Sequence, residues 1–309
     1  MRKLDLDKPL ETFAVFDILM AGVFIITFVL GISSLVARPA SQGWGIATFV
    51  FGMVMLVGDL LIAYGIWIAP RLWSVTNYRI GLIEHPTVWI KTVFIADFHA
   101  HKRKPAAWFS GVTKAIKELR PDLMLLGGDY VVWDGSDASH LNPLAELEPQ
   151  YGTYYVLGNH DYLDDPAAIR ERLTSFGWHD ITNANLTLRM QGKELGLSGL
   201  DEPLFGAPKY TEARAYHVPH LTLAHNPDSV LDLHEGQTDL LLAGHAHGGQ
   251  LRLPIVGSLF TPNKLGRKAD EGEKIINGIH MVVTRGLGEV GVRARFLCRP
   301  EIVVLELGI

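Results

Sequence analysis

Five short apolar runs along this chain each precede a block of aspartate, histidine, asparagine and glycine. The runs cover residues 93–96, 123–126, 154–157, 221–223 and 240–243. The blocks that follow them are Asp97-Phe98-His99, Gly128-Asp129, Gly158-Asn159-His160-Asp161, Ala224-His225-Asn226 and Gly244-His245-Ala246-His247. Short apolar runs that stop at glycine or a polar residue are typical of buried β-strands. Because neighbouring strands of an open α/β sheet gather ligands at their carboxyl ends, the pattern predicts that these distant side chains converge on one cleft.

Two long apolar stretches divide the first quarter of the 309-residue chain from the rest. Residues 13–36 and 44–68 are each close to the roughly 20 residues that a membrane-spanning helix needs. We therefore expect a two-helix transmembrane hairpin over 1–70, a linker over 71–87 and a catalytic domain over 88–309. The alternative is a signal peptide followed by a buried helix, but the second stretch is longer than most core helices. Asp59 lies inside it, where an ionisable side chain is expected to face a partner or the interface.

Basic residues flank the two apolar stretches unequally. They are Arg2, Lys3 and Lys8 before the first stretch, Arg38 between the two, and Arg71 and Arg79 after the second. Short loops rich in Lys and Arg stay in the cytoplasm. We therefore expect a multi-pass protein of the inner (plasma) membrane, with both ends and the catalytic domain in the cytoplasm.

Cysteine content and net charge restrict which cellular compartments and which partners are compatible with this chain. Cys298 is the single cysteine, which excludes an intramolecular disulfide and fits a reducing compartment. The formal net charge of −5 indicates that nucleic acid is not a partner.

The order of helical and extended patterns predicts a mixed α/β layered fold. Residues 105–119 have the apolar spacing of a helix with one buried face. Asp165 and Pro166 are a helix cap and first-turn pair, and the pattern they open ends at Gly177. Residues 186–190 and 194–200 alternate around a three-residue turn, as the strands of a hairpin do. The second half of the chain should therefore contain antiparallel strands as well.

The side chains of the five blocks are suited to binding metal ions. Asp97 and His99 are two residues apart, so at a strand end both can reach one cation. Asp129 follows two glycines, which let the chain turn sharply and present a carboxylate that can bridge two cations. The remaining candidate ligands are one amide oxygen and three imidazoles, from Asn159, His225, His245 and His247. This set contains no thiolate and suits manganese, iron, zinc or nickel.

A pair of divalent cations at such a site would attract a phosphoester. After Asp97, Asp129 and a bridging hydroxide are counted, roughly one positive charge would face the cleft. In two-metal hydrolysis the cations lower the pKa of a shared water, and hydroxide is the nucleophile. His160 lies next to a candidate ligand and could donate a proton to the leaving oxygen. Asp161 is expected to orient it.

At these residues the chain resembles the calcineurin-like metallophosphoesterase superfamily, whose blocks are DxH, GD, GNH(D/E), H and GHxH, in this order. The resemblance covers about residue 88 to the C-terminus and implies an α/β/β/α sandwich. It implies one metal at Asp97, His99, Asp129 and His247, a second at Asp129, Asn159, His225 and His245, and His160 as the catalytic histidine. Manganese is the first expectation, with iron or zinc as alternatives. Residues 248–250, 285–288 and 299–302 look like the membrane-associated YkuE-like and YaeI-like phosphodiesterase subgroup.

Two further residues near the blocks have open roles. His101 could be a ligand, but contact with a ligand or with the substrate is the better interpretation. Arg285 could pair with an anionic substrate or form a structural ion pair.

These patterns together indicate a membrane-anchored, dinuclear metal-dependent phosphoesterase, with a phosphodiesterase as the first expectation. The membrane anchor favours lipid-linked phosphoester or pyrophosphate substrates, of which the UDP-diacylglucosamine type is one, because a tethered enzyme meets membrane substrates at high effective concentration. Soluble nucleotides are an alternative substrate. A non-catalytic, metal-bound membrane scaffold is a second alternative, which the complete ligand set argues against.

Overall fold

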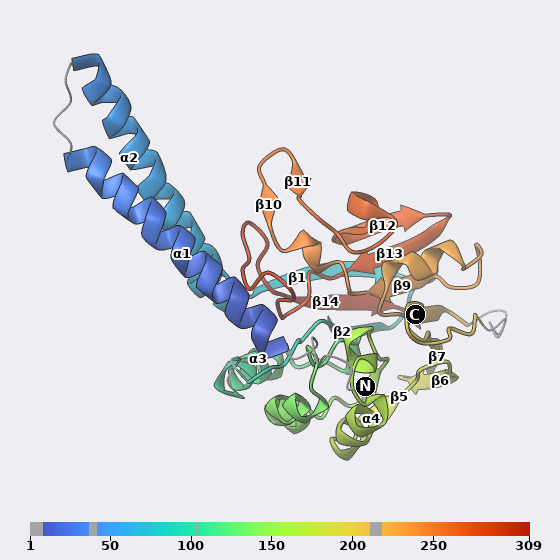
Figure 1. The fold of residues 1–309 in the computed structure, drawn as a ribbon. Coiled ribbons are helices and arrows are strands. Elements are labelled where there is room, and N and C mark those ends of the chain that lie inside the picture. Colours follow the sequence, from blue (N-terminus) through green and yellow to red (C-terminus); the bar gives the residue numbers. More distant parts are fainter. Residues whose placement is uncertain (1–8, 37–41, 103, 105, 211–217) are drawn as a thin grey trace.

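Two six-stranded sheets form the centre of the globular part (Figure 1). The structure is a computed structural model that describes residues 9–36, 42–102, 104, 106–210 and 218–309, with side chains from residue 18 in the first helix and from residue 45 in the second. The order of the first sheet is β1-β14-β2-β3-β4-β5. Its strands are β1 Ser74–Gly81, β14 Glu301–Gly308, β2 Trp89–Ile95, β3 Leu123–Leu126, β4 Thr153–Tyr155 and β5 His179–Asp180. Only the β14 to β2 pairing is antiparallel within this sheet.

The second sheet has the order β12-β13-β9-β8-β7-β6. Its strands are β12 Gly272–Ile276, β13 Ile279–Val283, β9 Leu240–Ala243, β8 His220–Leu223, β7 Lys193–Gly199 and β6 Asn185–Met190. The four central strands are parallel, and the pairings at both edges are antiparallel. The β6 to β7 pair confirms the hairpin that the alternating sequence predicts. A separate small hairpin joins β10 Arg252–Leu253 to β11 Gly257–Ser258.

The two sheets pack face to face around an apolar core. Phe94 and Leu125 of the first sheet belong to the same buried cluster as Leu221 and Leu242 of the second. A second buried cluster lies between the first sheet and the two helices that cover its outer face, α3 Ala106–Leu119 and α4 Pro166–Ser175. The mixed α/β fold is therefore confirmed.

Short helices replace long ones over the outer face of the second sheet. The helix η5 Pro227–Leu231 contributes Val230 to a third apolar cluster there. The other short helices of the globular part are η3 Gly135–Glu146, η4 His160–Tyr162, η6 His247–Gly249 and η7 Gly266–Ala269. Both helices predicted by local signals are present, and the Asp165 side chain caps α4 by accepting from the amides of Ala167 and Ala168.

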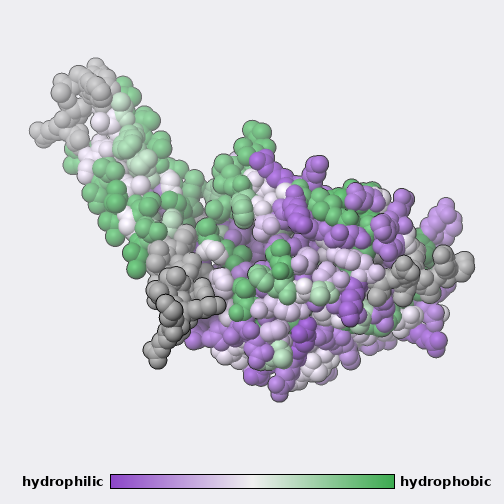
Figure 2. Space-filling view, turned by 45° about the vertical axis from the view of Figure 1, so that its right-hand side comes forward, coloured by the Kyte–Doolittle hydropathy of each residue, from purple (hydrophilic) through white to green (hydrophobic). Residues whose placement is uncertain are grey.

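Two long helices project from the globular part as an antiparallel pair (Figure 1). They are α1 Pro9–Val36 and α2 Gln42–Ala63, and α2 continues through a π-helical turn, η1 Tyr64–Ile68, and a 3-10 turn, η2 Ala69–Arg71. Residues 18–36 and 45–71 are long and apolar enough to cross a membrane. Their surface is largely hydrophobic, in contrast with the mixed surface of the globular part (Figure 2).

Small residues bring the two helices into close contact. A Cβ added to Gly52 would lie 2.8 Å from the carbonyl oxygen of Gly31, so only glycine fits this crossing. Asp59 is buried at the same contact, where its Oδ1 accepts a hydrogen bond from Thr27 Oγ1 at 2.5 Å. Asp59 therefore faces a partner, as expected, and that partner is Thr27 of α1.

The predicted linker is partly wrong, because residues 74–81 form β1 at the edge of the first sheet. This strand pairs in parallel along its whole length with β14, the last strand of the chain. Its alternation of half-buried and exposed side chains is that of an edge strand. The sequence gives no local sign of a partner that lies more than 200 residues away.

Candidate metal centre

The ends of five strands from both sheets meet at one site. Asp97 and His99 follow β2, Asp129 follows β3, and Asn159 follows β4. The second sheet contributes the residues after β8 and β9, which are His225, His245 and His247. All seven side chains are buried. The convergence arises because the two sheets direct the carboxyl ends of these strands to one edge of the sandwich.

Three groups of possible ligand atoms overlap at this site. Asp97, His99 and His247 form one group, and Asp129, His225 and His245 form another, each with its ligand atoms within 4.8 Å of one another. A third group joins His99, Asp129 and His160. Asp129 therefore belongs to two of the three groups and connects His225 and His245 with His99.

The distances around Asp129 describe this central position. Its Oδ2 lies 3.5 Å from His99 Nε2 and 3.2 Å from His225 Nε2. The Oδ1 of Asn159 lies 3.1 Å from the same His225 nitrogen. On the other side, His99 Nε2 and His247 Nε2 are 3.0 Å apart.

The backbone is strained where it delivers the ligands. The φ angles of Asp97, His99, Asp129, His245 and His247 lie between 43° and 66°, in the left-handed region that residues other than glycine rarely adopt. Such conformations persist where surrounding structure enforces them, and they concentrate at functional sites. Here each turn reverses the chain directly after a buried strand and points its side chain into the site.

The protonation states of three of the four candidate histidine ligands fit a site for cations. The fourth is His225, whose pKa burial lowers but the neighbouring Asp129 raises, to about 10. Burial lowers the pKa of His245 to about 3 and those of His99 and His247 well below their ordinary value, so these imidazoles are neutral, as metal binding requires. Burial, together with the nearby Asp129, raises the pKa of Asp97 to about 7. Two buried carboxylates side by side need compensating positive charge.

Unpaired nitrogens give a second indication of a cation. Within the described residues, His245 Nε2 is buried and has no hydrogen-bond partner, and the same holds for the Nδ1 atoms of His99 and His247. Buried polar atoms without partners are rare and call for an explanation. His245 Nε2 belongs to a set of imidazole and carboxylate donors, so a divalent metal ion bound there would explain why this nitrogen has no hydrogen-bond partner.

His160 lies at the edge of the site and is only partly buried. Its backbone amide donates to Asp129 Oδ1 at 2.8 Å, and its Nδ1 lies 2.6 Å from the carbonyl oxygen of Val132. The ring packs edge to face against His99, with 4.8 Å between centroids. These contacts fix the ring through Nδ1, so Nε2 is the nitrogen available for chemistry.

The expectation that Asp161 orients His160 is wrong. The fully buried Asp161 carboxylate accepts hydrogen bonds from the backbone amides of Asp129 at 2.9 Å, Tyr130 at 2.8 Å and Gly158 at 2.9 Å. It therefore holds together the two loops that carry Asp129 and Asn159, whereas Val132 orients the histidine ring. Adjacency to His160 in the sequence did not indicate that the carboxylate contacts backbone amides of neighbouring loops instead.

Replacement of Asp161 with asparagine should lower the stability of the globular part. An amide has one acceptor oxygen instead of two, and its NH2 group would face backbone N–H donors. We expect a loss of roughly 2–4 kcal/mol in the free energy of unfolding, which corresponds to a fall in Tm of roughly 5–10 °C for a domain of this size. Near-ultraviolet circular dichroism of the full-length protein in detergent measures it. Asp165→Asn is the matched control, since asparagine caps helices as well as aspartate does; equal melting of the two variants would contradict the role given to Asp161.

Gly158 allows Asp129 to occupy its central position. A Cβ on Gly158 would lie 2.2 Å from Asp129 Oδ1. Gly158→Ala should therefore displace this carboxylate and weaken metal binding, by roughly the 10- to 100-fold seen for residues that orient ligands. Titration with manganese, followed by isothermal calorimetry, measures this change. In the control Gly135→Ala the added Cβ would come no closer than 3.3 Å to another atom, so affinity should be unchanged.

The residues with open roles lie outside the ligand groups. His101 is nearly buried, and burial lowers its pKa to about 4, but it belongs to none of the groups found among the described residues. Arg285 donates to Glu301 Oε1 at 2.9 Å and to Ser74 Oγ at 3.0 Å. Arg295 is fully buried and donates to backbone carbonyl oxygens, among them that of Arg285. Arg285 therefore forms the structural ion pair that was one of its two expected roles.

One buried ion pair near the site was not anticipated. Lys104 Nζ lies 3.1 Å from Glu289 Oε2, with both side chains less than a tenth exposed, and it also lies 4.4 Å from the centroid of the Trp108 ring. It is close enough to His99 for its charge to lower the pKa of that ring. The two partners are distant in sequence and neither belongs to a motif, so no sequence signal could have paired them.

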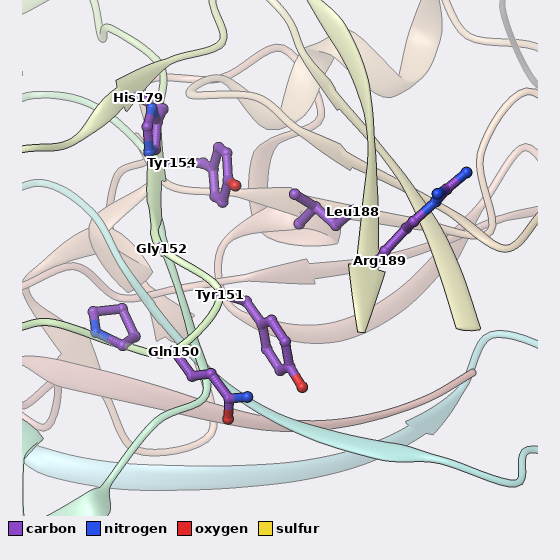
Figure 3. A pocket seen from close by; sticks show the side chains of 8 residues that line it. Gln150, Tyr151, Gly152, Tyr154, His179, Leu188 and Arg189 are labelled. Carbon is purple, nitrogen blue, oxygen red and sulfur yellow. The ribbon is translucent and has the colours of Figure 1, made fainter. Parts of the chain in front are cut away.

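A cavity of about 410 Å³ lies at the other end of β4, away from the ligand groups. Gly152 in its lining directly precedes β4, whereas Asn159 follows that strand. Figure 3 shows its lining, in which the Tyr154 ring stacks on His179 with 5.1 Å between centroids. The cavity and the candidate metal centre therefore lie at opposite ends of β4.

Comparisons with known proteins agree with this geometry. The family model for the calcineurin-like phosphoesterases matches residues 90–249. The chain is 34% identical to phosphodiesterase YaeI of Escherichia coli over 77% of this chain and 89% of that protein. It is 30% identical to the uncharacterized metallophosphoesterase YkuE of Bacillus subtilis, over 79% of this chain and 88% of that protein. It is also 24% identical to UDP-2,3-diacylglucosamine pyrophosphatase LpxG of Chlamydia muridarum, over 70% of this chain and 83% of that protein.

The matched region contains all five strand ends and all seven candidate ligands, in the order that the family requires. The resemblance first indicated by the motifs is confirmed by 34% identity over 77% of the chain. Phosphoester hydrolysis that depends on divalent metal is the activity of this family. The chain belongs to the calcineurin-like phosphoesterase family.

Proposed function

We propose that this chain is a membrane-anchored phosphodiesterase with two divalent metal ions, acting on lipid-linked phosphoester or pyrophosphate bonds. The observation that carries the proposal is that Asp129 is shared by two groups of possible ligand atoms, one with His99 and one with His225. A carboxylate shared in this way is the arrangement that a pair of cations needs.

The proposed ligands divide into two sets that share Asp129. One set is Asp97, His99, Asp129 and His247, and the other is Asp129, Asn159, His225 and His245. Manganese is the first candidate for both positions, because oxygen and imidazole donors without thiolate suit it. Bound divalent cations would supply a hydroxide nucleophile and offset the charge that develops on the phosphate.

In this proposal His160 acts as the general acid. Its Nδ1 is held by the Val132 carbonyl, so Nε2 can donate to the leaving oxygen of a bound phosphoester. Its partial exposure leaves it accessible to a substrate, unlike the buried ligands. Because the ring is fixed before the substrate arrives, little reorganisation accompanies proton donation.

Membrane anchoring is proposed from the two long apolar helices. Their outward side chains are exposed, among them Ile18, Leu30 and Leu60. Water is an unfavourable solvent for such a surface, and a bilayer is a favourable one. The distribution of basic residues supports a cytoplasmic catalytic domain as part of this proposal. The name of the LpxG relative, a UDP-2,3-diacylglucosamine pyrophosphatase, supports a lipid-linked pyrophosphate among the substrates.

Incubation with membrane lipids tests the proposed function. Full-length protein loaded with manganese is mixed with a bacterial lipid extract, and the loss of individual phosphoester lipids is followed by mass spectrometry, with Asp129→Asn as control. Loss of one lipid class with the wild type alone is the expected result. Turnover of a soluble nitrophenyl diester without lipid loss would point to a soluble substrate such as a nucleotide. Inactivity on both would overturn an enzymatic role and favour a scaffold.

A further inference from the structure

The small hairpin of β10 and β11 carries an exposed apolar tip. Leu253, Ile255, Val256, Leu259 and Phe260 are all exposed, Ile255 completely and Phe260 to 73%. The hairpin projects from the globular part on the side from which α1 and α2 emerge (Figure 1). A hydrophobic projection is visible there beside the helices (Figure 2). Five neighbouring exposed apolar side chains in one loop form a surface that a soluble partner or a membrane would cover.

An apolar cavity of about 420 Å³ lies between this hairpin and the helix pair. Met20, Leu61 and Ile62 line it from the helices. Leu251, Leu259 and Phe296 line it from the globular part. Its volume is within the roughly 300–1,000 Å³ of ligand sites. The cavity thus joins the exposed tip to the surface of the helices.

The two walls of the cavity are held together by the backbone. The amide of Arg295 donates to the carbonyl oxygen of Gly65 in η1 at 2.9 Å. A Cβ on Gly65 would lie 3.3 Å from the Arg295 carbonyl oxygen, so the two segments are in close contact. The cavity is therefore a fixed feature of the junction between helices and globular part.

The same wall leads directly to the candidate metal centre. Leu251 follows His247 by four residues, and η6 connects them. Gln250 exchanges two hydrogen bonds with the backbone of Val290, at 2.8 and 2.9 Å, and so ties this segment to the loop before Phe296. A molecule in the cavity would lie against the chain segment that carries His247.

The lining determines the chemistry of the occupant. The accessible surface of the cavity is apolar, so a peptide would leave its backbone donors and acceptors without partners there. A hydrocarbon chain has no such groups. The helices that form one wall are long and apolar enough to span a bilayer, so an acyl chain could enter from the side without crossing water.

We propose that the β10–β11 tip inserts into the bilayer and that the cavity behind it holds one acyl chain of a membrane lipid. The lipid then lies with its headgroup on the side of the metal centre. This inference deepens the proposed function and rests on it for the choice of a lipid substrate, but lipid occupancy itself does not require turnover.

Photocrosslinking tests occupancy without catalysis. The full-length Asp129→Asn variant is placed in vesicles of phosphatidylethanolamine and phosphatidylglycerol that contain a phospholipid with a diazirine near the end of one acyl chain. Crosslinked peptides are identified by mass spectrometry. We expect labelling of residues 251–260 and 292–296 in addition to α1 and α2. Labelling confined to the two helices would overturn the proposal.

A pair of glycine variants locates the lipid within the cavity. Gly58 lines the cavity, and a Cβ there would meet no atom within 4 Å, so Gly58→Leu should fill part of the space without a clash. Gly22→Leu is the matched control, because Gly22 on α1 has the same freedom and does not line this cavity. Labelling of 251–260 should fall about tenfold in Gly58→Leu only. Equal labelling of the two variants would contradict an acyl chain in the cavity.

Substitutions at the tip connect occupancy with hydrolysis. With Ile255→Ser and Phe260→Ser combined in an otherwise wild-type chain, hydrolysis of vesicle lipid should fall about tenfold or more, because two large apolar side chains no longer enter the bilayer. Turnover of a soluble nitrophenyl diester should be unchanged. Unaltered lipid hydrolysis would contradict insertion of the tip. If the wild type hydrolyses no lipid but crosslinking still depends on Gly58, the lipid site stands and the proposed substrate is wrong.

Discussion

Replacement of Asp129 with asparagine should reduce phosphodiester turnover by about 10³-fold or more. Asp129 is shared by two of the ligand groups, so the change removes one negative charge and one of the two carboxylate oxygens from both at once. Metal ions contribute several kcal/mol of transition-state stabilisation in such sites, and each 1.4 kcal/mol is a factor of ten in rate. Turnover of a nitrophenyl diester at saturating manganese measures the loss.

Metal content distinguishes this explanation from a general loss of folding. We expect inductively coupled plasma mass spectrometry to find two metal ions per wild-type chain and one or none in Asp129→Asn. The near-ultraviolet circular dichroism of the two proteins should be the same. The control Asp165→Asn removes the same charge from an exposed helix cap and should leave both metal content and turnover at the wild-type level. Full metal content and near-normal turnover in Asp129→Asn would refute a bridging role.

The predictable part of the fold is the part encoded locally. The apolar runs before Asp97, Asp129 and His225 are strands because each run is short, apolar and ended by residues that turn the chain. The start of α4 is also encoded locally, because Asp165 caps the helix and Pro166 suits its first turn. The convergence of the ligand blocks could be anticipated because strand ends in α/β sheets meet at one edge.

The parts that could not be predicted depend on long-range contacts. The strand β1 was expected as linker because its partner, β14, is the last strand of the chain. The role of Asp161 was missed because its partners are backbone amides of two other loops, which no motif encodes. The lipid contact that we propose for the β10–β11 hairpin has no sequence signal, because a few apolar residues in a loop are common and only the fold places them beside α1 and α2.

Replacement of His160 should slow turnover by roughly 10²–10⁴-fold, the usual contribution of a general acid. Because Asp129 is within reach of His160 as well as His99, the ring could instead be a metal ligand. The metal content of His160→Ala separates the two roles. We expect it to remain at two ions per chain, since the Nδ1 contact with Val132 and the edge position fit a proton donor better than a ligand.

The leaving group decides whether His160 donates a proton. A nitrophenolate leaves without protonation, whereas an alkoxide of a lipid glycerol needs a proton as the bond to phosphorus breaks. The loss in His160→Ala should therefore be much larger for a dialkyl phosphodiester than for a nitrophenyl diester. His160→Gln retains a hydrogen-bond donor but cannot transfer a proton, so it should recover part of the nitrophenyl activity and none of the dialkyl activity. Equal losses on both esters in both variants would show that His160 orients the substrate and is not the acid.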